Sequence, residues 1–244
     1  MTDDQPSVPS YASYTRDTTD SLKSLAHKRR HRQVLDLIAP PLLIDRVLDY
    51  GCGDGHLFSF LVHKYKRQNL VGYDPNPKLL AEAAPSVSAG AELTTDIDSL
   101  ITNRSSSFSL IYCIEVCEHL TDKSLDELLK HITVLAAPRA RIVFGVPIET
   151  GPSGFLKSMY RTAHGGRQSA SIAQAFRALF NMKLERKVTD TEWYGAHTGF
   201  SHMRFRKILE QGGFRIIKTR HLPIPALRSV LNNEIYFVCE KGSR

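Results

Sequence analysis

The run Val-Leu-Asp-Tyr-Gly-Cys-Gly-Asp-Gly, residues 47–55, narrows the folds open to this chain more than any other feature. It begins as a short strand that carries Asp49 and then packs three glycines into five residues. Glycines are needed in such a turn where a ligand approaches the backbone closely or where φ is positive. The run therefore predicts a ligand-binding turn between a buried strand and a helix.

Apolar runs suited to buried strands recur after this turn, and most are separated by stretches with helical patterning. The strand-like runs are Arg46–Tyr50, Leu70–Tyr73, Ala91–Thr95, Phe108–Ile114 and Arg141–Val146. The helical stretches are His56–Tyr65, Pro77–Ala84 and Lys123–Ala136. Alternation at this spacing predicts an α/β fold, a parallel sheet with helices on both faces.

The chain closes with a helix over Ser201–Gln211, stopped by two glycines, and two β-rich runs at Phe214–Thr219 and Glu234–Cys239. The link between these runs is too short for a helical crossover. It therefore favours an antiparallel last strand.

Two segments do not follow this alternation of strands and helices. Residues 1–17 are polar and are predicted to form a flexible arm, followed by a helix over Thr19–Ile38. Residues 148–198 are rich in Gly and Pro, with two helices expected around Phe155–Arg161 and Ile172–Phe180. We expect one domain over residues 18–244, in which 148–198 is a helical insertion or lid after strand five that covers the substrate site.

Composition and charge limit the partners. The apolar fraction is 42%, and no apolar run approaches the roughly 20 residues that span a bilayer. Residues 139–244 hold 18 Lys and Arg against 7 Asp and Glu, a balance of +11, whereas residues 1–138 balance at −4. A basic half suits an anionic partner, or is simply a solvated face.

The cysteines indicate a reducing compartment. None forms a CxxC pair or has zinc-ligand spacing, and buried free thiols in the cytoplasm are the simplest interpretation. The four are Cys52, Cys113, Cys117 and Cys239.

Acidic residues around the glycine turn indicate which class of ligand the turn binds. A nicotinamide-binding turn has the spacing GxGxxG, and the N-terminus of the helix that follows it binds the pyrophosphate of the cofactor. Here Asp49 precedes the first glycine by two residues, an acid that would repel a pyrophosphate but suits a cationic amine and sulfonium. Asp74 ends the next strand, where an acid can accept the hydroxyls of a ribose. Asp96 and Ile97 follow the third strand; a turn cap is the alternative for both Asp74 and Asp96.

Together the glycine turn and these acids resemble the class I S-adenosylmethionine-dependent methyltransferases over about Val47–Val146. The resemblance implies a Rossmann-like, doubly wound, mostly parallel seven-stranded sheet with an antiparallel last strand, and S-adenosyl-L-methionine as cofactor. It also implies the cofactor-binding residues: Asp49, Gly51 and Gly53 for the methionine part, Asp74 for the ribose, Asp96 and Ile97 for the adenine, with Cys113 and Ile114 beside the cofactor.

The segment Glu115-Val116-Cys117-Glu118-His119-Leu120 is similar to the ExxEH segment of two methyltransferase groups. These are the ubiquinone-pathway O-methyltransferases and the enzymes that methylate the terminal 2′-hydroxyl of small RNAs. In the second group both Glu, the His and a later His bind a divalent metal, and His197 or His202 would be that later His. Since ExxEH also occurs in metal-free methyltransferases, helix capping with a structural His is the alternative. The spacing does not fix the later ligand, so we predict no metal and expect catalysis to survive EDTA.

The connector from Trp193 to His202 combines histidine, glycine and aromatic residues, as substrate-facing loops do, although a packed hinge is equally consistent. A hydroxyl acceptor needs a base near neutral pH, and His119 or His197 is suitable in type.

We therefore predict O-methylation of a small-molecule acceptor. The alternatives are an RNA 2′-O-methyltransferase of the ExxEH type, which the basic half favours although no RNA-binding module is present, and a non-catalytic cofactor-binding regulatory protein. A nicotinamide dehydrogenase is the least supported.

Overall fold

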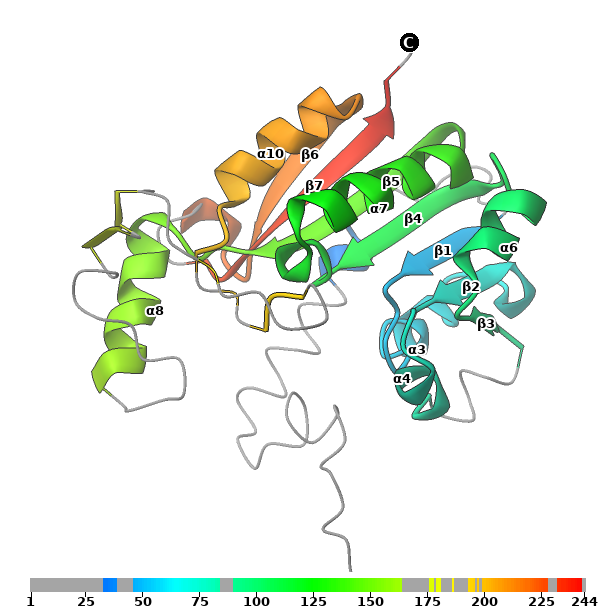
Figure 1. Cartoon of the computed structure of the whole chain (residues 1–244), viewed down its shortest axis with the longest axis horizontal. Helices are drawn as coiled ribbons and strands as arrows, with labels where there is room; N and C mark the ends of the chain where they lie inside the picture. The colour runs from blue at the N-terminus through cyan, green and yellow to red at the C-terminus, as the bar shows by residue number, and fades with distance from the viewer. Residues whose placement is uncertain are drawn as a thin grey trace, which may run out of the picture.

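The computed structural model describes residues 33–38, 46–83, 90–163, 176–177, 179–180, 186, 193–195, 197, 199–227 and 232–242. Within these residues, seven strands form one sheet (Figure 1). They are β1 (Val47–Tyr50), β2 (Leu70–Tyr73), β3 (Glu92–Thr94), β4 (Phe108–Ile114), β5 (Ala136–Pro147), β6 (Phe214–Leu222) and β7 (Glu234–Lys241).

Helices connect most of these strands, and several begin at a residue whose side chain accepts a hydrogen bond from a backbone N–H two or three positions later. The capping residues are Asn76, Asp96, Thr121 and Ser201. The helices are α3 (Phe58–Leu61), α4 (Pro77–Ala81), α6 (Ile97–Asn103), α7 (Asp122–Leu135), α8 (Gly151–Ala163) and α10 (His202–Gln211). Short 3₁₀ turns lie at η1 (Arg67–Asn69), η2 (Cys117–His119) and η3 (Pro225–Leu227).

The sheet order is β3-β2-β1-β4-β5-β7-β6, and only β7 runs antiparallel to its neighbours. This is the Rossmann-like, mostly parallel sheet with an antiparallel last strand that the resemblance implied. The chain moves outward from β1 to β3 and then returns to place β4 beside β1. In open α/β sheets, ligands bind outside the carboxyl ends of the strands at such a reversal.

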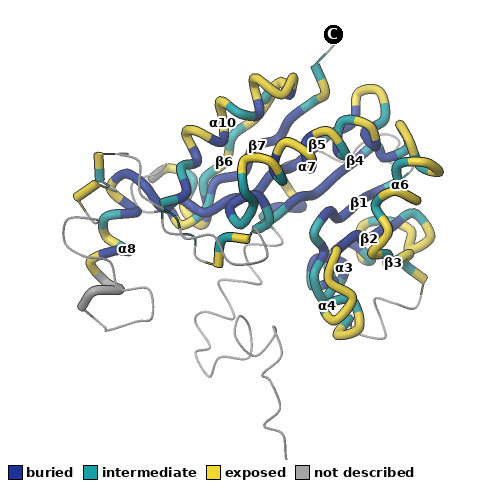
Figure 2. Tube along the Cα trace, viewed as in Figure 1, coloured by how far each residue is buried: buried dark blue, intermediate teal, exposed yellow. Residues whose placement is uncertain are grey.

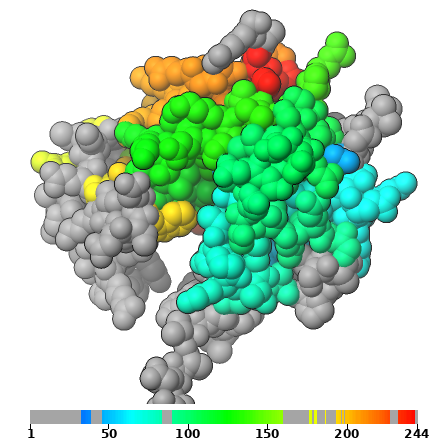
Figure 3. All heavy atoms as spheres, turned by 45° about the vertical axis from the view of Figure 1, so that its right-hand side comes forward, coloured from blue at the N-terminus to red at the C-terminus, as the bar shows by residue number. Residues whose placement is uncertain are grey.

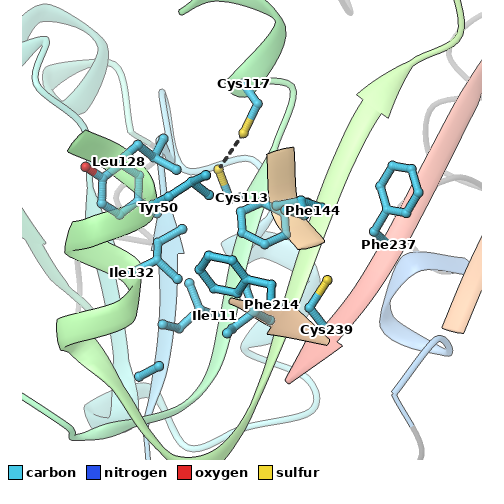
Figure 4. Close-up of a cluster of buried hydrophobic side chains, with 14 of the residues drawn as sticks. Tyr50, Ile111, Cys113, Cys117, Leu128, Ile132, Phe144, Phe214, Phe237 and Cys239 are labelled. Carbon is cyan, nitrogen blue, oxygen red and sulfur yellow. Dashed lines mark hydrogen bonds between the residues drawn. The ribbon is translucent and has the colours of Figure 1, made fainter. Parts of the chain in front are cut away.

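Two hydrophobic cores lie on opposite faces of the sheet, because successive strand residues point to opposite sides. Leu48, Ile111 and Phe144 belong to the core under α7 and α10, whereas Leu110 and Val143 belong to the core that includes α3 and residues 34–38. Figure 2 shows the buried strands between more exposed helices, and Figure 3 shows α6 and α7 covering one side. Figure 4 shows the first core from within, where Cys113 and Cys117 meet.

The structure corrects several predicted strand bounds. Leu70–Tyr73 and Phe108–Ile114 are confirmed, whereas β3 is one residue shorter at each end than predicted. β5 begins at Ala136 instead of Arg141, because Ala136 already pairs with Phe108 before an irregularity in the ladder. β6 continues beyond Thr219 to Leu222, since its pairing with β7 extends that far.

Helix predictions need larger corrections. α6 was not predicted, and α3 is a single turn within the predicted His56–Tyr65. α8 begins at Gly151, four residues before the predicted start, because the Gly-Pro-Ser-Gly run that reads as a loop forms its first turn. A side chain at Gly154 would clash with the carbonyl of Glu149, so the close packing of this turn requires glycine there.

Some predictions fall outside the described residues: the arm over 1–17 and most of the helices at Thr19–Ile38 and Ile172–Phe180. In the part of the chain that is described, no helix is both long enough and apolar enough to cross a membrane. All four cysteines are free and buried, as predicted.

Candidate active site

The glycine turn follows β1 and adopts the backbone that its sequence predicts. Gly51, Gly53 and Gly55 have φ values of 81°, 55° and 73°, a region that side-chain-bearing residues rarely adopt. A Cβ at Gly51 would also clash with the side chain of Val116. The backbone N–H groups of Gly51 and Cys52 donate to the Tyr73 carbonyl at 2.7 and 3.0 Å, which joins the ends of β1 and β2.

Two buried carboxyl groups, Asp49 and Asp74, lie beside this turn. Asp74 accepts hydrogen bonds of 2.9 Å from the backbone N–H groups of Gly53 and Asn76. Burial raises the pKa of Asp74, and those two hydrogen bonds partly oppose the rise. Burial, reinforced by the negative charge of Asp74, raises the pKa of Asp49 to about 8. Two acids buried this close favour a cationic ligand, which would stabilise their ionised forms.

The other predicted cofactor residues lie in line along the same edge of the sheet. Asp96 is exposed and caps α6, since its Oδ1 accepts from the Ser99 N–H at 2.8 Å. Ile97, next in the chain, packs against the core. Cys113 is fully buried near the end of β4, and Ile114 is the last residue of that strand.

The ExxEH segment follows β4 and contacts the glycine turn through Val116, whose side chain faces Gly51. Glu115, the first residue after β4, has a φ of 58°, which is unusual for a residue other than glycine. Its N–H donates to the Gly145 carbonyl at 2.9 Å. This bend directs the chain into η2, which carries Glu118 and His119.

Glu118 is completely buried, and neither of its carboxylate oxygens has a hydrogen-bond partner among the described residues. Burial and the neighbouring Glu115 carboxylate raise the pKa of Glu118 well above its ordinary range. Because an unsatisfied buried carboxyl group is costly, this position indicates a function beyond packing.

His119 and His197 face each other, with 3.1 Å between their Nε2 atoms. The Nδ1 of His119 lies 2.7 Å from the Tyr194 carbonyl oxygen, which can only accept, so this nitrogen carries the proton. The Nε2 of neutral His119 is therefore an acceptor, and His197 donates to it. Burial lowers the pKa of His119 more than the carbonyl contact raises it, which favours this neutral form.

Residues of the insertion hold this pair in place. The Trp193 ring stacks on His119 with 4.5 Å between centroids and 3° between planes. The Tyr194 N–H donates to the His119 carbonyl at 2.8 Å. Arg186 donates to the Glu118 carbonyl, and its guanidinium lies 3.9 Å from the centre of the Tyr194 ring. The insertion thus reaches the ExxEH segment through several contacts.

His202, the other candidate for a later ligand, lies apart from this cluster. It is the first residue of α10 and is buried, and its Nδ1 has no hydrogen-bond partner among the described residues. Burial, with His221 and Lys157 nearby, lowers its pKa to about 4. The structure therefore brings His197, and not His202, to His119.

Comparison with known proteins assigns the chain to a family. The sequence model of a methyltransferase domain matches residues 20–219, most of the chain. The chain belongs to this methyltransferase family. With the glycine turn and buried acids at the carboxyl edge of a Rossmann-like sheet, it is an S-adenosylmethionine-dependent enzyme. No curated protein matches the sequence.

Solved methyltransferase structures share the fold at low sequence identity. Magnesium protoporphyrin IX methyltransferase from Synechocystis PCC 6803, with bound S-adenosylhomocysteine, is 15% identical with a TM-score of 0.57, over 94% of this chain and 91% of that chain. A methyltransferase from Archaeoglobus fulgidus is 15% identical with a TM-score of 0.57, over 91% and 100%. The methyltransferase domain of bacterial CtHen1 is 16% identical with a TM-score of 0.57, over 88% and 99%. At these identities the comparisons show the fold alone.

The methyltransferase also has a group of side chains that could hold a divalent metal. One ligand atom from each of Glu118, His119 and His197 lies within 4.8 Å of the others. Two nitrogen ligands about 2.1 Å from one metal and at right angles to each other lie about 3 Å apart, close to the Nε2 separation found here. Glu118 Oε1 lies 3.9 Å from the Nε2 of His197, and neither Glu118 oxygen has a hydrogen-bond partner among the described residues, which fits a metal site. The Nδ1 contact that orients His119 fits one as well. The prediction of a metal-free site rested on the unfixed position of the later histidine, and the structure removes that reason.

Sequence reasoning missed one contact residue of the methyltransferase, Arg186. It is a single arginine in the insertion with no motif around it, so only the folded chain reveals its contact with Glu118.

Proposed function

We propose that this methyltransferase transfers a methyl group to the oxygen of a small-molecule acceptor in the cytoplasm. The observation that carries the proposal is the His119–His197 pair, in which burial favours neutral His119. The pair joins the ExxEH segment, which contacts the glycine turn, to the insertion that carries His197. A hydroxyl acceptor needs a base at this position, whereas the sulfonium donor is already activated.

The cofactor would be held by the residues that the sequence predicts. Asp49, Gly51 and Gly53 would bind the methionine part, because the buried acid favours its cationic amine. Asp74 would accept the ribose hydroxyls, and Asp96 with Ile97 would bind the adenine. Cys113 and Ile114, at the end of β4, would lie beside the cofactor.

In the proposed reaction, the acceptor oxygen forms a bond to the methyl carbon as the bond from that carbon to sulfur breaks. The hydroxyl proton goes to His197. In its neutral form His197 donates through Nε2 to His119, so its Nδ1 carries the lone pair that takes the proton. His119 acts as the positioning residue, because its own Nδ1–H is bonded to the Tyr194 carbonyl.

The insertion over residues 148–198 would cover the acceptor. It supplies His197, the partly exposed Trp193 and Arg186, a combination that suits a planar or anionic small molecule. The basic half of the chain supports an anionic acceptor. A structural neighbour, 1,6-didemethyltoxoflavin-N1-methyltransferase from Burkholderia thailandensis, holds its small-molecule acceptor on the same fold at 14% identity and a TM-score of 0.57.

A second candidate is methylation of an RNA 2′-hydroxyl with a divalent metal. The specific observation in its favour is the cluster of Glu118, His119 and His197. When bound there, a divalent ion would lower the pKa of an acceptor hydroxyl. Glu118 would then supply a charged oxygen that lacks a hydrogen-bond partner among the described residues.

One experiment tests both candidates. The protein is incubated with a radiolabelled methyl donor and either a metabolite pool or an RNA pool, with and without EDTA. Label in small molecules that survives EDTA supports the first candidate. Label in RNA that EDTA removes and Mn²⁺ or Mg²⁺ restores supports the second. If no pool is labelled while the cofactor still binds, the chain is a non-catalytic cofactor-binding protein and both candidates are wrong.

A further inference from the structure

A groove of about 860 Å³ lies at the edge of the sheet opposite the glycine turn. It is formed where β4, β5 and β6 begin and where β7 ends, near the C-terminus marked in Figure 1. The cofactor and acceptor residues lie where the parallel strands end, so this groove is a separate site. Its volume falls within the roughly 300–1,000 Å³ of typical small-molecule sites.

The groove is strongly basic. Arg139, Arg141, Arg215 and Lys241 line it, against one acid, Glu240. Glu240 lies between two of these cations and accepts from both Arg141 on β5 and Arg215 on β6. Each guanidinium has five N–H donors in a planar fork, so one shared carboxylate leaves donors on both for a further anion.

A distortion of the sheet places Arg139 in this groove. Phe108 pairs with Ala136 and Leu110 with Arg141, so two steps along β4 match five along β5. The three extra residues, with Pro138 among them, bulge from the ladder, because proline has no N–H to donate. Bulges of this kind redirect side chains and are enriched next to functional sites. The Arg139 side chain has no ion-pair partner among the described residues.

The backbone of the groove is also strained. Among the described residues, the non-glycine residues with positive φ are Ser106, Glu115 and Arg139. Glu115 lies at the candidate active site, whereas Ser106, at 53°, and Arg139, at 64°, both line this groove. Strain of this kind costs on the order of 1–3 kcal/mol per residue and clusters where a ligand is bound. A glycine would relieve it at position 139, yet the chain carries an arginine there.

We infer that this groove binds a small phosphate-bearing molecule, held by Arg139 and by the paired guanidinium groups of Arg141 and Arg215. The planar forks of these arginines suit the oxygens of a phosphate. Glu240 fixes two of the three in position before the ligand arrives, which reduces the entropy lost on binding.

The test is calorimetry with inorganic pyrophosphate on the full chain, at low ionic strength and again at about 0.15 M. We expect 1:1 binding that Arg139→Gly weakens at least about tenfold, the effect of losing a charge-assisted hydrogen bond. Thermal unfolding of Arg139→Gly should occur at the same or a higher temperature, because glycine tolerates φ near 64°. Arg215→Ala should weaken binding as well.

The matched control is Arg206→Ala, which removes the same charge from the exposed face of α10, outside the groove. Its affinity for pyrophosphate should stay within about twofold of the original. Equal losses in Arg206→Ala and Arg139→Gly would mean general charge attraction and overturn the inference. It is also wrong if pyrophosphate does not bind, or if RNA displaces it and loses affinity in the same variants, since the groove would then be part of a nucleic-acid surface.

Discussion

The proposed cofactor side and the proposed acceptor side of the site are assembled over different distances along the chain. Gly53 and Asp74 share a hydrogen bond and are 21 positions apart, in neighbouring βα units. His119 and His197 are 78 positions apart, and the second lies in the insertion. The first arrangement lies within two consecutive βα units, so a glycine turn followed by an acid at the end of the next strand reports it. The second joins two residues that no local motif connects.

The largest expected effect is on kcat in His197→Ala, a change that should affect catalysis far more than cofactor binding. His197→Ala should lower kcat by about 10²–10⁴-fold, the usual contribution of a general base. Cofactor affinity should change by less than about threefold, because His197 contacts His119 and Glu118 in the ExxEH segment. Steady-state kinetics on the acceptor found in the labelling screen, with calorimetry of the cofactor, measure both.

His63→Ala provides the matched control, because His63 is exposed after α3 and far in sequence from the ExxEH segment. It should leave kcat unchanged. An unaltered kcat in His197→Ala would show that the two sides are not divided in this way.

The converse change is Asp74→Ala. It should weaken binding of S-adenosylmethionine by about 1–3 kcal/mol, roughly 5- to 150-fold, since the ribose hydroxyls would lose a charged acceptor. At saturating cofactor, kcat should change little. Calorimetry measures the loss, and Asp98→Ala, an exposed acid on α6, is the control. Unaltered affinity in Asp74→Ala would remove the ribose assignment.

The same contrast between local and distant contacts explains which elements and site residues the sequence could predict. β2 and β4 matched their predicted bounds because short apolar strands of a parallel sheet are buried on both faces. The helix α6 was missed because it spans only seven residues and contains a single buried one, Leu100. His197 could not be chosen over His202 by spacing, since both lie in the connector from Trp193 to His202, only five positions apart. Arg139 is not part of any sequence motif, and its position depends on a bulge that only the β4–β5 pairing reveals.

The ionisation of Asp49 should make both the stability of the protein and its cofactor affinity depend on pH. Its pKa is raised from 3.8 to about 8, so the empty protein keeps this proton between those values while the unfolded chain has lost it. This group therefore contributes stability that falls as pH rises from about 4 to about 8. A cationic cofactor prefers the ionised form, so its affinity should rise with pH, by less than about tenfold between pH 7 and 8.

Calorimetry in buffers of different ionisation enthalpy measures the proton released on cofactor binding. Asp49→Asn should abolish that release and flatten the pH dependence of both affinity and thermal unfolding. His197 lies on the other side of the site, so His197→Ala should keep the proton release of the original protein. If Asp49→Asn released the same number of protons, another group would be responsible.

The smallest expected effect concerns Asp96, which has two assigned roles: it caps α6 and would accept the adenine amino group. Asparagine caps helices about as well as aspartate, so the free energy of unfolding of Asp96→Asn should lie within about 0.5 kcal/mol of that of the original protein. With its oxygen used by the Ser99 N–H, its amide NH₂ would face the adenine amino group, donor against donor. We expect cofactor affinity to fall about three- to tenfold, from the loss of one hydrogen bond. Asp96→Ala should lose both affinity and about 1 kcal/mol of stability. If Asp96→Asn bound the cofactor normally while Asp96→Ala was only less stable, Asp96 would be a cap alone, and the adenine would be bound by residues that a local motif does not report.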